Sequence, residues 1–270
     1  MDKYTKGNLE LWNELTPIHD GSEFYDVDGF KNGRNTLTSI ELEEVGDVSG
    51  KSLLHLQCHF GMDTMSWARL GAKVTGVDFS DKAIALARSL SKETGIKANF
   101  ICSDIYKLPE VLNKKSDIVF TSTGVLCWLP DLKRWGETIA HFLKPGGVFY
   151  IFEEHPFTVV FDNSAGVTEL KVTQSYFHTA EPVAWEVKGS YTGEKTDRLH
   201  TSYEWTHSMG DIINALINAG LRIEFIHEFT LCSWRRFPFM EQDEGGWWRL
   251  KGNKIPLTFS LKASKPGNRR

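Results

Sequence analysis

The stretch that decides the fold runs from Leu53 to Ser80 and reads LLHLQCHFGMDTMSWARLGAKVTGVDFS. Its apolar start predicts a buried strand, and the segment from about Asp63 to Leu70 predicts a short helix. Gly71 is the expected C-cap, after which a second strand, KVTGVD, ends on Asp78. This is the outline of a nucleotide-binding βαβ unit, in which the loop after the first strand usually carries two or three glycines and an acid. Here that region carries His55, Gln57, Cys58 and His59 before a single glycine, Gly61.

The same alternation of strands and helices continues beyond this unit. Ser80 is the expected N-cap of the helix DKAIALARSLSKETG, and the strands KANFICSD and SDIVFTS follow. The helix DLKRWGETIAHFL then leads through a KPGG turn into the strand VFYIFEE. Short apolar strands alternating with helices of about ten residues predict an α/β fold with a doubly wound, mostly parallel sheet.

The regular pattern breaks at His155. Polar and apolar residues alternate from there to about Thr206, as in ELKVTQSYF and VAWEVKGSYT, which predicts an antiparallel β insert after the fifth strand. The helix SMGDIINALINAG and the strands LRIEFIHEF and IPLTFSLKAS follow. We therefore expect four parts: a helical and loop cap (1–49), a ligand-binding core (50–154), the insert (155–206), and a C-terminal part that completes the sheet (207–270).

Composition excludes several classes of protein. The chain has 270 residues, of which 41% are hydrophobic, enough for one large α/β domain or two small ones. A net charge of −4 gives no reason to expect a nucleic acid or an anionic membrane as partner. The four cysteines form no CxxC pair, and the sequence shows neither a signal core nor a membrane-spanning run. We expect a cytoplasmic protein, monomeric or homodimeric.

Acidic and small residues follow the predicted strands, where ligands bind in open α/β sheets. Asp78 ends the second strand and Asp104 follows the third, while TSTG (121–124) follows the fourth. An acid at the first of these positions can accept both hydroxyls of a ribose, and an acid at the second can accept an adenine amine. Backbone amides at the start of the first helix can meet a carboxylate or a phosphate. Together these residues predict a ligand with a nucleoside part.

Four motifs of this sequence together resemble those of a known family. LLHLQCHFG…GAKVTGVDFS, ICSDIYKLP, DIVFTSTGVLCWLPDL and FLKPGGVFYIFE resemble the successive motifs of the class I S-adenosylmethionine-dependent methyltransferases. The resemblance is close over residues 50–153 and looser over the last helix and two strands. It implies a seven-stranded Rossmann-like sheet with a reversed last strand. It also implies S-adenosylmethionine as cofactor and methyl transfer to a small-molecule acceptor.

The resemblance also assigns residues. Asp78 would bind the ribose hydroxyls, and Phe79 would pack on the adenine. Asp104 would face the adenine amine, and Ile105 would flank the ring. The residues assigned to the other end of the cofactor are Gln57, His59 and Gly61 along the methionine part, Thr121 near the sulfonium, and Tyr25 as a cover from the N-terminal segment.

The chain departs from the family at the first strand. The usual acid of that strand is His55 here, and two of the usual glycines are Gln57 and His59. A cofactor amine seeking a carboxylate needs another partner, for which Asp63 is near enough in sequence. Gly61 keeps the position at which the helix is expected to approach the ligand closely.

The sequence raises two further side-chain roles, a metal site in the loop after the first strand and a general base after the fifth strand. A metal site built on His55, Cys58 and His59 is not expected, because His55 and Cys58 point to opposite faces of a strand and no metal-ligand spacing supports them. Cys58 is expected to be a small buried residue. His155 follows the fifth strand and is the candidate general base, because its ordinary pKa lies near neutrality; a histidine in a turn before a proline is the alternative.

Other functions are compatible with the same fold. A NAD-dependent dehydrogenase would share the strand-end acid but should carry GxGxxG, which QCHFGM does not match. A non-catalytic S-adenosylmethionine-binding or sensor protein would differ only in turnover. The tetrapeptide typical of enzymes that methylate exocyclic or amide nitrogens is absent after the fourth strand, which argues against a nucleic-acid substrate. The aromatic content of the cap and the insert predicts a small, partly apolar acceptor, and leaves open whether oxygen, nitrogen, sulfur or carbon is methylated.

Overall fold

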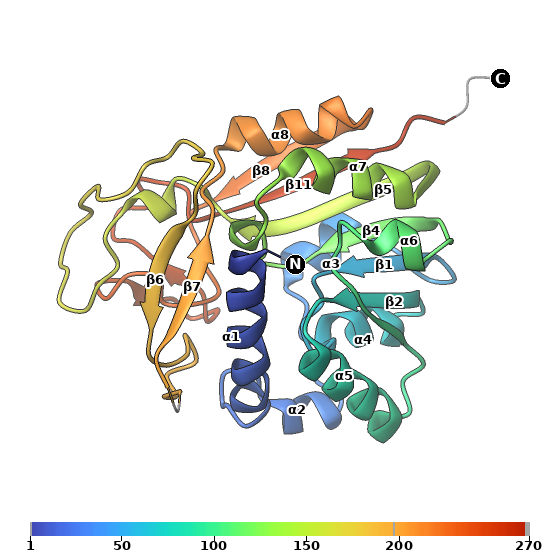
Figure 1. Ribbon diagram of the computed structural model, residues 1–270, viewed down its shortest axis with the longest axis horizontal. Helices are drawn as coiled ribbons and strands as arrows, with labels where there is room; N and C mark the ends of the chain where they lie inside the picture. Colours follow the sequence, from blue (N-terminus) through green and yellow to red (C-terminus); the bar gives the residue numbers. More distant parts are fainter. Residues whose placement is uncertain (1, 197, 268–270) are drawn as a thin grey trace.

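A seven-stranded sheet forms the centre of the protein, as the computed structural model of residues 2–196 and 198–267 shows (Figure 1). Its spatial order is β3-β2-β1-β4-β5-β11-β8. Strand β11 runs antiparallel to both of its neighbours, while β1 to β5 pair in parallel. The predicted fold class, with its reversed last strand, is confirmed. The strands are β1 (Ser52–Leu56), β2 (Lys73–Asp78), β3 (Asn99–Cys102), β4 (Ser116–Thr121), β5 (Leu143–Glu154), β8 (Arg222–Phe229) and β11 (Thr258–Ser264).

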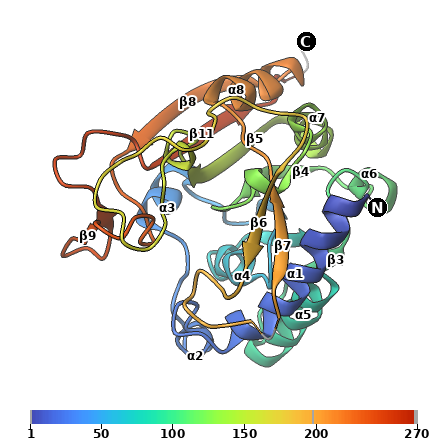
Figure 2. The ribbon, with the colours of Figure 1, turned by 60° about the vertical axis from the view of Figure 1, so that its left-hand side comes forward.

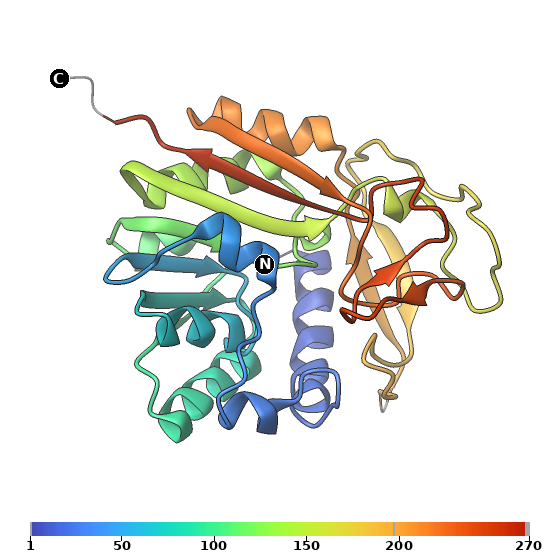
Figure 3. The same ribbon diagram turned by 180° about the vertical axis from the view of Figure 1, so that it is seen from behind.

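Helices cover both faces of the sheet, because successive residues of the buried strands point to opposite sides. Leu54 packs with α6 (Leu108–Val111), α7 (Leu132–Phe142) and α8 (Met209–Asn218) on one face. Leu53 packs on the other face, which α3 (Ser39–Val45) and α4 (Met62–Arg69) cover (Figure 3). Helix α5 (Asp81–Thr94) packs against α4 through Ile84 and Ala87. The result is a three-layer core in which the carboxyl ends of β1 to β5 share one edge.

The predicted signals at the ends of α5 are confirmed. The Ser80 side chain accepts from the backbone N–H of Ala83, and Gly95 closes the helix with a φ of 70°. The KPGG turn was expected to precede the fifth strand, but β5 already begins at Leu143 and includes this turn. Gly146 has a φ of 78° there, and the pairing of β4 with β5 shifts register between Ser116 and Ile118. The turn is therefore an irregularity within the first residues of β5.

The N-terminal segment begins with a helix of 18 residues. The N-cap of helix α1 (Lys3–Asp20) is Asp2, whose carboxylate accepts from the backbone N–H groups of Tyr4 and Thr5. A short helix, α2 (Val27–Lys31), follows. In Figure 2, α1 lies between α5 and the β6–β7 hairpin, at the carboxyl edge of the sheet. The cap predicted from the sequence is therefore placed over the strand ends that were expected to bind a ligand.

The insert after β5 contains less sheet than expected. Strands β6 (Val183–Val187) and β7 (His200–Glu204) form an antiparallel hairpin, as predicted from VAWEVKGSYT. The alternating stretch ELKVTQSYF forms no strand among the described residues and contributes only an isolated bridge between Phe161 and Val172. The connections also hold η1 (Leu126–Trp128), η2 (Thr158–Val160), β9 (Glu241–Gln242) and β10 (Trp248–Arg249). None of the helices in the described ranges is long and apolar enough to cross a membrane.

Candidate functional site

The loop after β1 has a backbone suited to glycine, although it carries only one. Gln57 has a φ of 57° and His59 a φ of 51°, and Gly61 follows with a φ of 79°. All three lie in the left-handed region, which costs a residue with a Cβ roughly 1–2 kcal/mol. The chain thus keeps the conformation of a glycine-rich loop while it adds two side chains at the carboxyl edge of the sheet. Strain of this kind is often retained at functional sites.

Packing within the protein favours a glycine at position 61. A Cβ on Gly61 would lie 2.4 Å from Cε1 and 2.6 Å from Cζ of Phe100, on β3. The residue also precedes α4, where it serves as N-cap without a side chain. Within the protein, the close approach at this position is to the Phe100 ring; the close approach to a ligand stays a prediction.

The carboxylate of Asp78 joins two parts of this edge. Its Oδ2 accepts from the backbone N–H of His59 at 2.8 Å, and its Oδ1 accepts from that of Ser80 at 2.9 Å. The side chain is 7% exposed. Burial raises the pKa of Asp78 to about 6, against the opposing effect of the backbone N–H groups. Asp78 therefore fixes the loop after β1 to the start of α5, and each oxygen keeps a further lone pair for a ligand.

The other predicted residues of this edge lie at the ends of β2, β3 and β4. Asp104 follows β3, and its Oδ1 accepts from the backbone N–H of Tyr106 at 2.8 Å. Phe79 is half-buried, whereas Ile105 is only 4% exposed and packs in the core with α6 and α7. Thr121 is fully buried at the end of β4. The structure thus brings these residues to one edge, with Ile105 turned toward the core.

Aromatic rings cover the edge. The Trp12 ring lies 5.2 Å from that of His59 and 5.4 Å from that of Trp128. The rings of His19 and Tyr25 stack at 5.0 Å. The rings thus come from α1, the segment after it, the β1 loop and η1. We call these five residues the aromatic cover. Trp12 and His19, which we did not predict for the site, are seven residues apart in one helix, a spacing that places both on the same face.

Two histidines of the cover meet. Nδ1 of His19 lies 3.4 Å from Nε2 of His59, and Nε2 of His19 lies 2.8 Å from Oγ of Ser190, in the loop between β6 and β7. Burial lowers the pKa of His19 to about 4. Burial, with His19 as neighbour, also lowers the pKa of His59 well below its usual value. Both rings are therefore neutral at pH 7.

Helix α1 is bonded on both of its sides. Asn13 accepts from Oγ of Ser80 at 2.6 Å and donates to the Asp81 carboxylate at 2.8 Å, which ties it to the start of α5. On the hairpin side, the amide of Asn8 donates to the carbonyl of Tyr203 and accepts from its N–H, both at 2.8 Å. The helix thereby links the strand ends of the core to β7.

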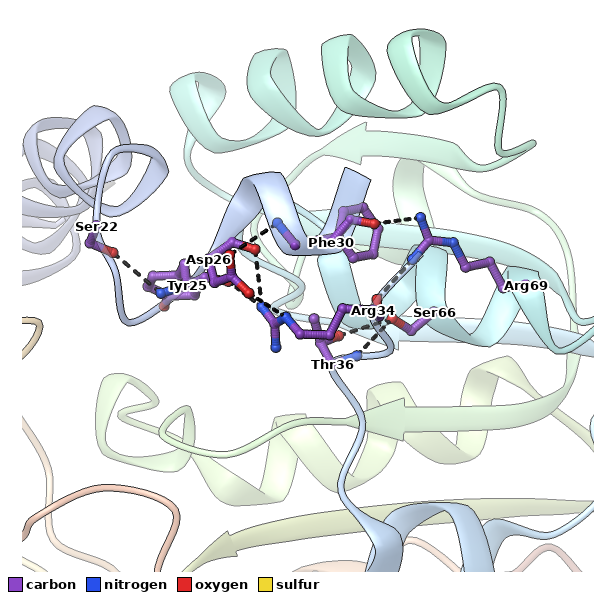
Figure 4. Close-up of polar contacts among 9 residues, drawn as sticks. Ser22, Tyr25, Asp26, Phe30, Arg34, Thr36, Ser66 and Arg69 are labelled. Atoms are coloured by element: carbon purple, nitrogen blue, oxygen red, sulfur yellow. Dashed lines mark hydrogen bonds and ion pairs between the residues drawn. The ribbon is translucent and has the colours of Figure 1, made fainter. Parts of the chain in front are cut away.

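The segment after α1 is anchored to α4, as Figure 4 shows. Arg34 pairs with the Asp26 carboxylate at 2.9 Å and also donates to the carbonyl of Tyr25. Arg69 on α4 donates to the carbonyls of Phe30 and Arg34. These contacts hold Tyr25 in the cover, where its ring lies 5.5 Å from that of His59.

Asp63 lies below this segment, in the first turn of α4. Its Oδ1 accepts from Oγ1 of Thr36 at 2.5 Å. Burial raises the pKa of Asp63, while Thr36, Arg34 and Ser122 act in the opposite direction. Because Ser122 follows β4, the Asp63 carboxylate faces the same edge as the β1 loop. It is thus placed to meet an amine there.

His55 takes the position of the expected acid and is neutral. Its Nδ1 lies 2.8 Å from Oγ1 of Thr64, on α4, and its Nε2 lies 3.2 Å from Oγ of Ser122. Complete burial lowers the pKa of His55 to about 3. Cys58 is buried, as expected. Within the described ranges, no group of three or more His, Cys, Asp or Glu residues is arranged to hold a metal ion.

Several buried polar atoms at this edge lack a partner. Oε1 of Gln57, Nε1 of Trp12 and Oγ1 of Thr121 make no hydrogen bond within the described part of the chain. A buried polar atom in this state costs about 1–3 kcal/mol. The set contains both acceptors and a donor, so a polar ligand with groups of both kinds would satisfy it. S-Adenosylmethionine, with an ammonium, a carboxylate and hydroxyls, fits these residues.

His155 lies apart from the aromatic cover, toward β8 and β11. Its Nδ1 accepts from the backbone N–H of Phe157 at 3.0 Å, and its Nε2 lies 2.8 Å from Oε1 of Glu228. In the neutral ring, Nε2 therefore carries the proton and donates a hydrogen bond to the Glu228 carboxylate. Burial lowers the pKa of His155, and Glu228 acts in the opposite direction. With both nitrogens in use, this geometry does not favour His155 as a general base, and the structure places it in a turn.

The His155→Gln variant is expected to lose stability and to keep its ligand affinity. Losing the contacts to Glu228 and Phe157 should lower the free energy of unfolding by about 1–2 kcal/mol. Affinity for S-adenosylmethionine should stay within about twofold of wild type, because the ring lies outside the candidate site. Urea unfolding and isothermal titration measure the two quantities. A large loss of affinity at unchanged stability would return His155 to the site.

The left-handed backbone at His59 predicts that a glycine variant is more stable than an alanine variant at this position, the reverse of the order inside a helix. His59→Gly should be more stable than His59→Ala by about 1 kcal/mol, because only glycine adopts a φ near 51° without cost. Ser89, exposed in the middle of α5, is the matched control. There the glycine variant should be less stable than the alanine variant by about 1 kcal/mol. Denaturant unfolding of the four variants tests this, and the same order at both positions would contradict it.

Comparison with known proteins agrees with this geometry. Residues 54–151 match the family described as the methyltransferase domain. A ubiquinone biosynthesis O-methyltransferase of Vibrio cholerae is 31% identical over 144 residues, 51% of this chain and 58% of that one. The chain spans little more than half the length of this relative and of the Xanthomonas euvesicatoria protein of the same name.

Solved structures show the same fold. An S-adenosylmethionine-dependent methyltransferase from Mesorhizobium loti has a TM-score of 0.58 at 21% identity, covering 92% of this chain and all of that one. The [4+2]-cyclase SpnF has a TM-score of 0.58 at 17% identity, covering 96% of this chain and 95% of that one. At these identities the likeness concerns the fold alone, and the second name shows that the fold also occurs in a protein named for another reaction.

Proposed function

Because residues 54–151 match the methyltransferase-domain family, we propose that this protein transfers the methyl group of S-adenosylmethionine to a small-molecule acceptor. The observation that carries the proposal is the arrangement of acids at the edge of the sheet. Asp78 and Asp104 follow the neighbouring strands β2 and β3, beside the left-handed loop after β1. Such an edge suits a ribose, an adenine and a charged tail placed side by side.

The proposed roles of the residues follow from their places. Asp78 binds the ribose hydroxyls and Asp104 the adenine amine, with Phe79 and Ile105 against the ring. The residues of the methionine end are Gln57, His59 and Gly61 along the tail, Asp63 at the ammonium, Thr121 near the sulfonium, and Tyr25 as cover. Gln57 suits this role because no donor from the described residues reaches its Oε1. The neutral His55 leaves Asp63 as the carboxylate nearest to the β1 loop in sequence.

When bound, the cofactor supplies a methyl group on a sulfonium, which an acceptor atom takes by in-line displacement. The protein contributes position, and alignment of reacting groups accounts for much of the rate in reactions of this kind. The aromatic cover shields the edge from water, which protects the reactive group and strengthens polar contacts inside. Neutral His19 and His59 add no repulsive charge beside a cationic sulfonium.

The acceptor pocket is proposed to lie between α1, η1 and the β6–β7 hairpin. The carbonyl of Cys127 accepts from the backbone N–H of Trp205 at 2.8 Å, so η1 and the chain after β7 meet there. The Glu204 side chain is half-buried near Arg236 and Glu154, and burial raises its pKa. The curated relatives are named O-methyltransferases, so acceptors with a hydroxyl group are the first class to test.

Titration calorimetry with S-adenosylmethionine and with NAD tests the cofactor. We expect binding of the first and none of the second. A wild-type protein that bound neither would contradict the proposal. Turnover is tested by incubating the protein with methyl-labelled S-adenosylmethionine and a panel of small hydroxylated compounds. Binding without transfer to any acceptor would favour the alternative of a non-catalytic cofactor-binding protein.

A further inference from the structure

One buried carboxylate holds the loop after β4. Glu153, near the end of β5, is 4% exposed. Its Oε1 accepts from the backbone N–H groups of Gly124 at 2.6 Å and Glu154 at 2.7 Å. Its Oε2 accepts from those of Val125 at 2.8 Å and Leu126 at 3.2 Å. Four backbone donors therefore converge on a single side chain.

The carbonyls of the same loop reach the walls of the candidate site. Val125 O accepts from Nε2 of Gln57 at 3.1 Å, in the loop after β1. Gly124 O accepts from Nε1 of Trp128 at 2.8 Å, and the Trp128 ring packs on Trp12 in the aromatic cover. The N–H groups of the loop thus face Glu153, while its carbonyls orient side chains that surround the proposed cofactor site.

We propose that Glu153 is a positioning residue for cofactor binding, which acts on Gln57 through the backbone of Val125. The inference rests on the proposed function, because Gln57 is placed there along the methionine part of the cofactor. With Nε2 of Gln57 fixed on the Val125 carbonyl, its unpartnered Oε1 is held in one direction, toward the edge of the sheet. A side chain oriented before binding loses less freedom when the ligand arrives.

The contact requires two acceptor oxygens. A carboxylate offers acceptors on both sides, whereas a glutamine of the same shape would turn an NH2 group toward two N–H donors. Glu153→Gln should therefore lose two of the four hydrogen bonds from backbone N–H groups and leave the packing volume unchanged. Glu153→Asp keeps both oxygens and withdraws them by one methylene, so its effect should be intermediate.

A double-mutant cycle separates positioning from general stability. The dissociation constant of S-adenosylmethionine is measured by calorimetry for wild type, Glu153→Gln, Gln57→Ala and the double variant. Measurements are made at pH 8, above the pKa of about 7 to which burial raises Glu153. Each single variant should bind about tenfold more weakly, and the double variant should be within about twofold of the weaker single one. Glu137→Gln, exposed on α7, is the control expected to bind like wild type.

The outcomes are distinct. If the losses of the two single variants multiply to about 100-fold, Glu153 does not act through Gln57 and the inference is overturned. It is also overturned if Glu153→Gln binds as tightly as wild type. If thermal unfolding shows that Glu153→Gln does not fold, the Glu153→Asp cycle decides by the same criteria. If wild type itself does not bind S-adenosylmethionine, the proposed function fails, and this inference fails with it.

Discussion

Replacing Asp78 with alanine is expected to weaken S-adenosylmethionine binding at least about 100-fold. The carboxylate holds the backbone N–H groups of His59 and Ser80, and in the proposed complex it accepts two ribose hydroxyls. A hydrogen bond to a charged group contributes about 1.5–3 kcal/mol, so the loss of two accounts for this factor. Titration calorimetry of wild type and Asp78→Ala measures it.

The pH dependence of binding adds a second measurement on the same residue. Burial raises the pKa of Asp78 to about 6, so the carboxylate loses its charge as the pH falls through that value. Hydroxyl donors prefer the ionised form, so the titration of Asp78 should leave affinity unchanged above about pH 7 and lower it by up to about tenfold per pH unit below 6. In Asp78→Asn this contribution near pH 6 should disappear, because the amide does not titrate, while the decrease that follows protonation of Glu153 near pH 7 should remain.

Asp117→Asn is the matched control for the Asp78 experiment. Asp117 lies at the opposite end of the sheet, where it pairs with Lys144 at 2.9 Å and accepts from Ser52. Its replacement should lower the melting temperature and leave the dissociation constant unchanged. If Asp78→Ala binds within about threefold of wild type, or if both variants weaken binding equally, the ribose contact assigned to Asp78 is wrong.

The strand-end acids could be predicted because they depend only on topology. In a parallel sheet the carboxyl ends of neighbouring strands meet at one edge, so Asp78 and Asp104 were expected together as soon as their strands were recognised. The periodic pattern of the strands and the glycine after α5 were sufficient to recognise the strands that end near Asp78 and Asp104. These two signals are local and do not depend on contacts between distant parts of the chain.

His155 shows where such reasoning ends. Its position after the fifth strand was correct, but the direction of its ring depends on Glu228, which lies on β8 and follows much later in the sequence. The insert shows the same limit. ELKVTQSYF has the alternation of a strand, but a strand also needs a neighbour, and the described residues supply only one bridge at Val172. Alternation shows which sequences suit a sheet, not whether an edge is available for them.

The β1 loop shows a different limit. The sequence reveals that Gln57 and His59 replace glycines, and a change of backbone would have been the simplest consequence. Instead the left-handed conformation is kept at both positions. The hydrogen bond from His59 N–H to Asp78 and that from Gln57 to Val125 hold it, and both are tertiary contacts. The strain is offset by groups that a local reading of the sequence does not include.

Gly61→Ala is expected to be the most destabilising single change in this loop. The added Cβ would lie 2.4 Å from the Phe100 ring, at a backbone φ of 79°. Overpacking costs about 1–3 kcal/mol, and the left-handed conformation costs a further 1–2 kcal/mol or so. We therefore expect the free energy of unfolding to fall by about 2–5 kcal/mol, measured by urea unfolding. A change that large is close to the whole stability of many domains.

Gly95 and Phe100 allow the two contributions to be separated. Gly95 has a φ of 70°, and no atom of the described residues lies within 4 Å of an added Cβ. Gly95→Ala therefore carries the strain without the clash and should lose only about 1–2 kcal/mol. In Gly61→Ala/Phe100→Leu the smaller side chain removes the clash. The double variant should therefore be more stable than the sum of the two single losses predicts. Equal losses for Gly61→Ala and Gly95→Ala, or strict additivity in the double variant, would show that the Phe100 ring moves away at little cost. The β1 loop would then be held at Gly61 by its backbone conformation alone.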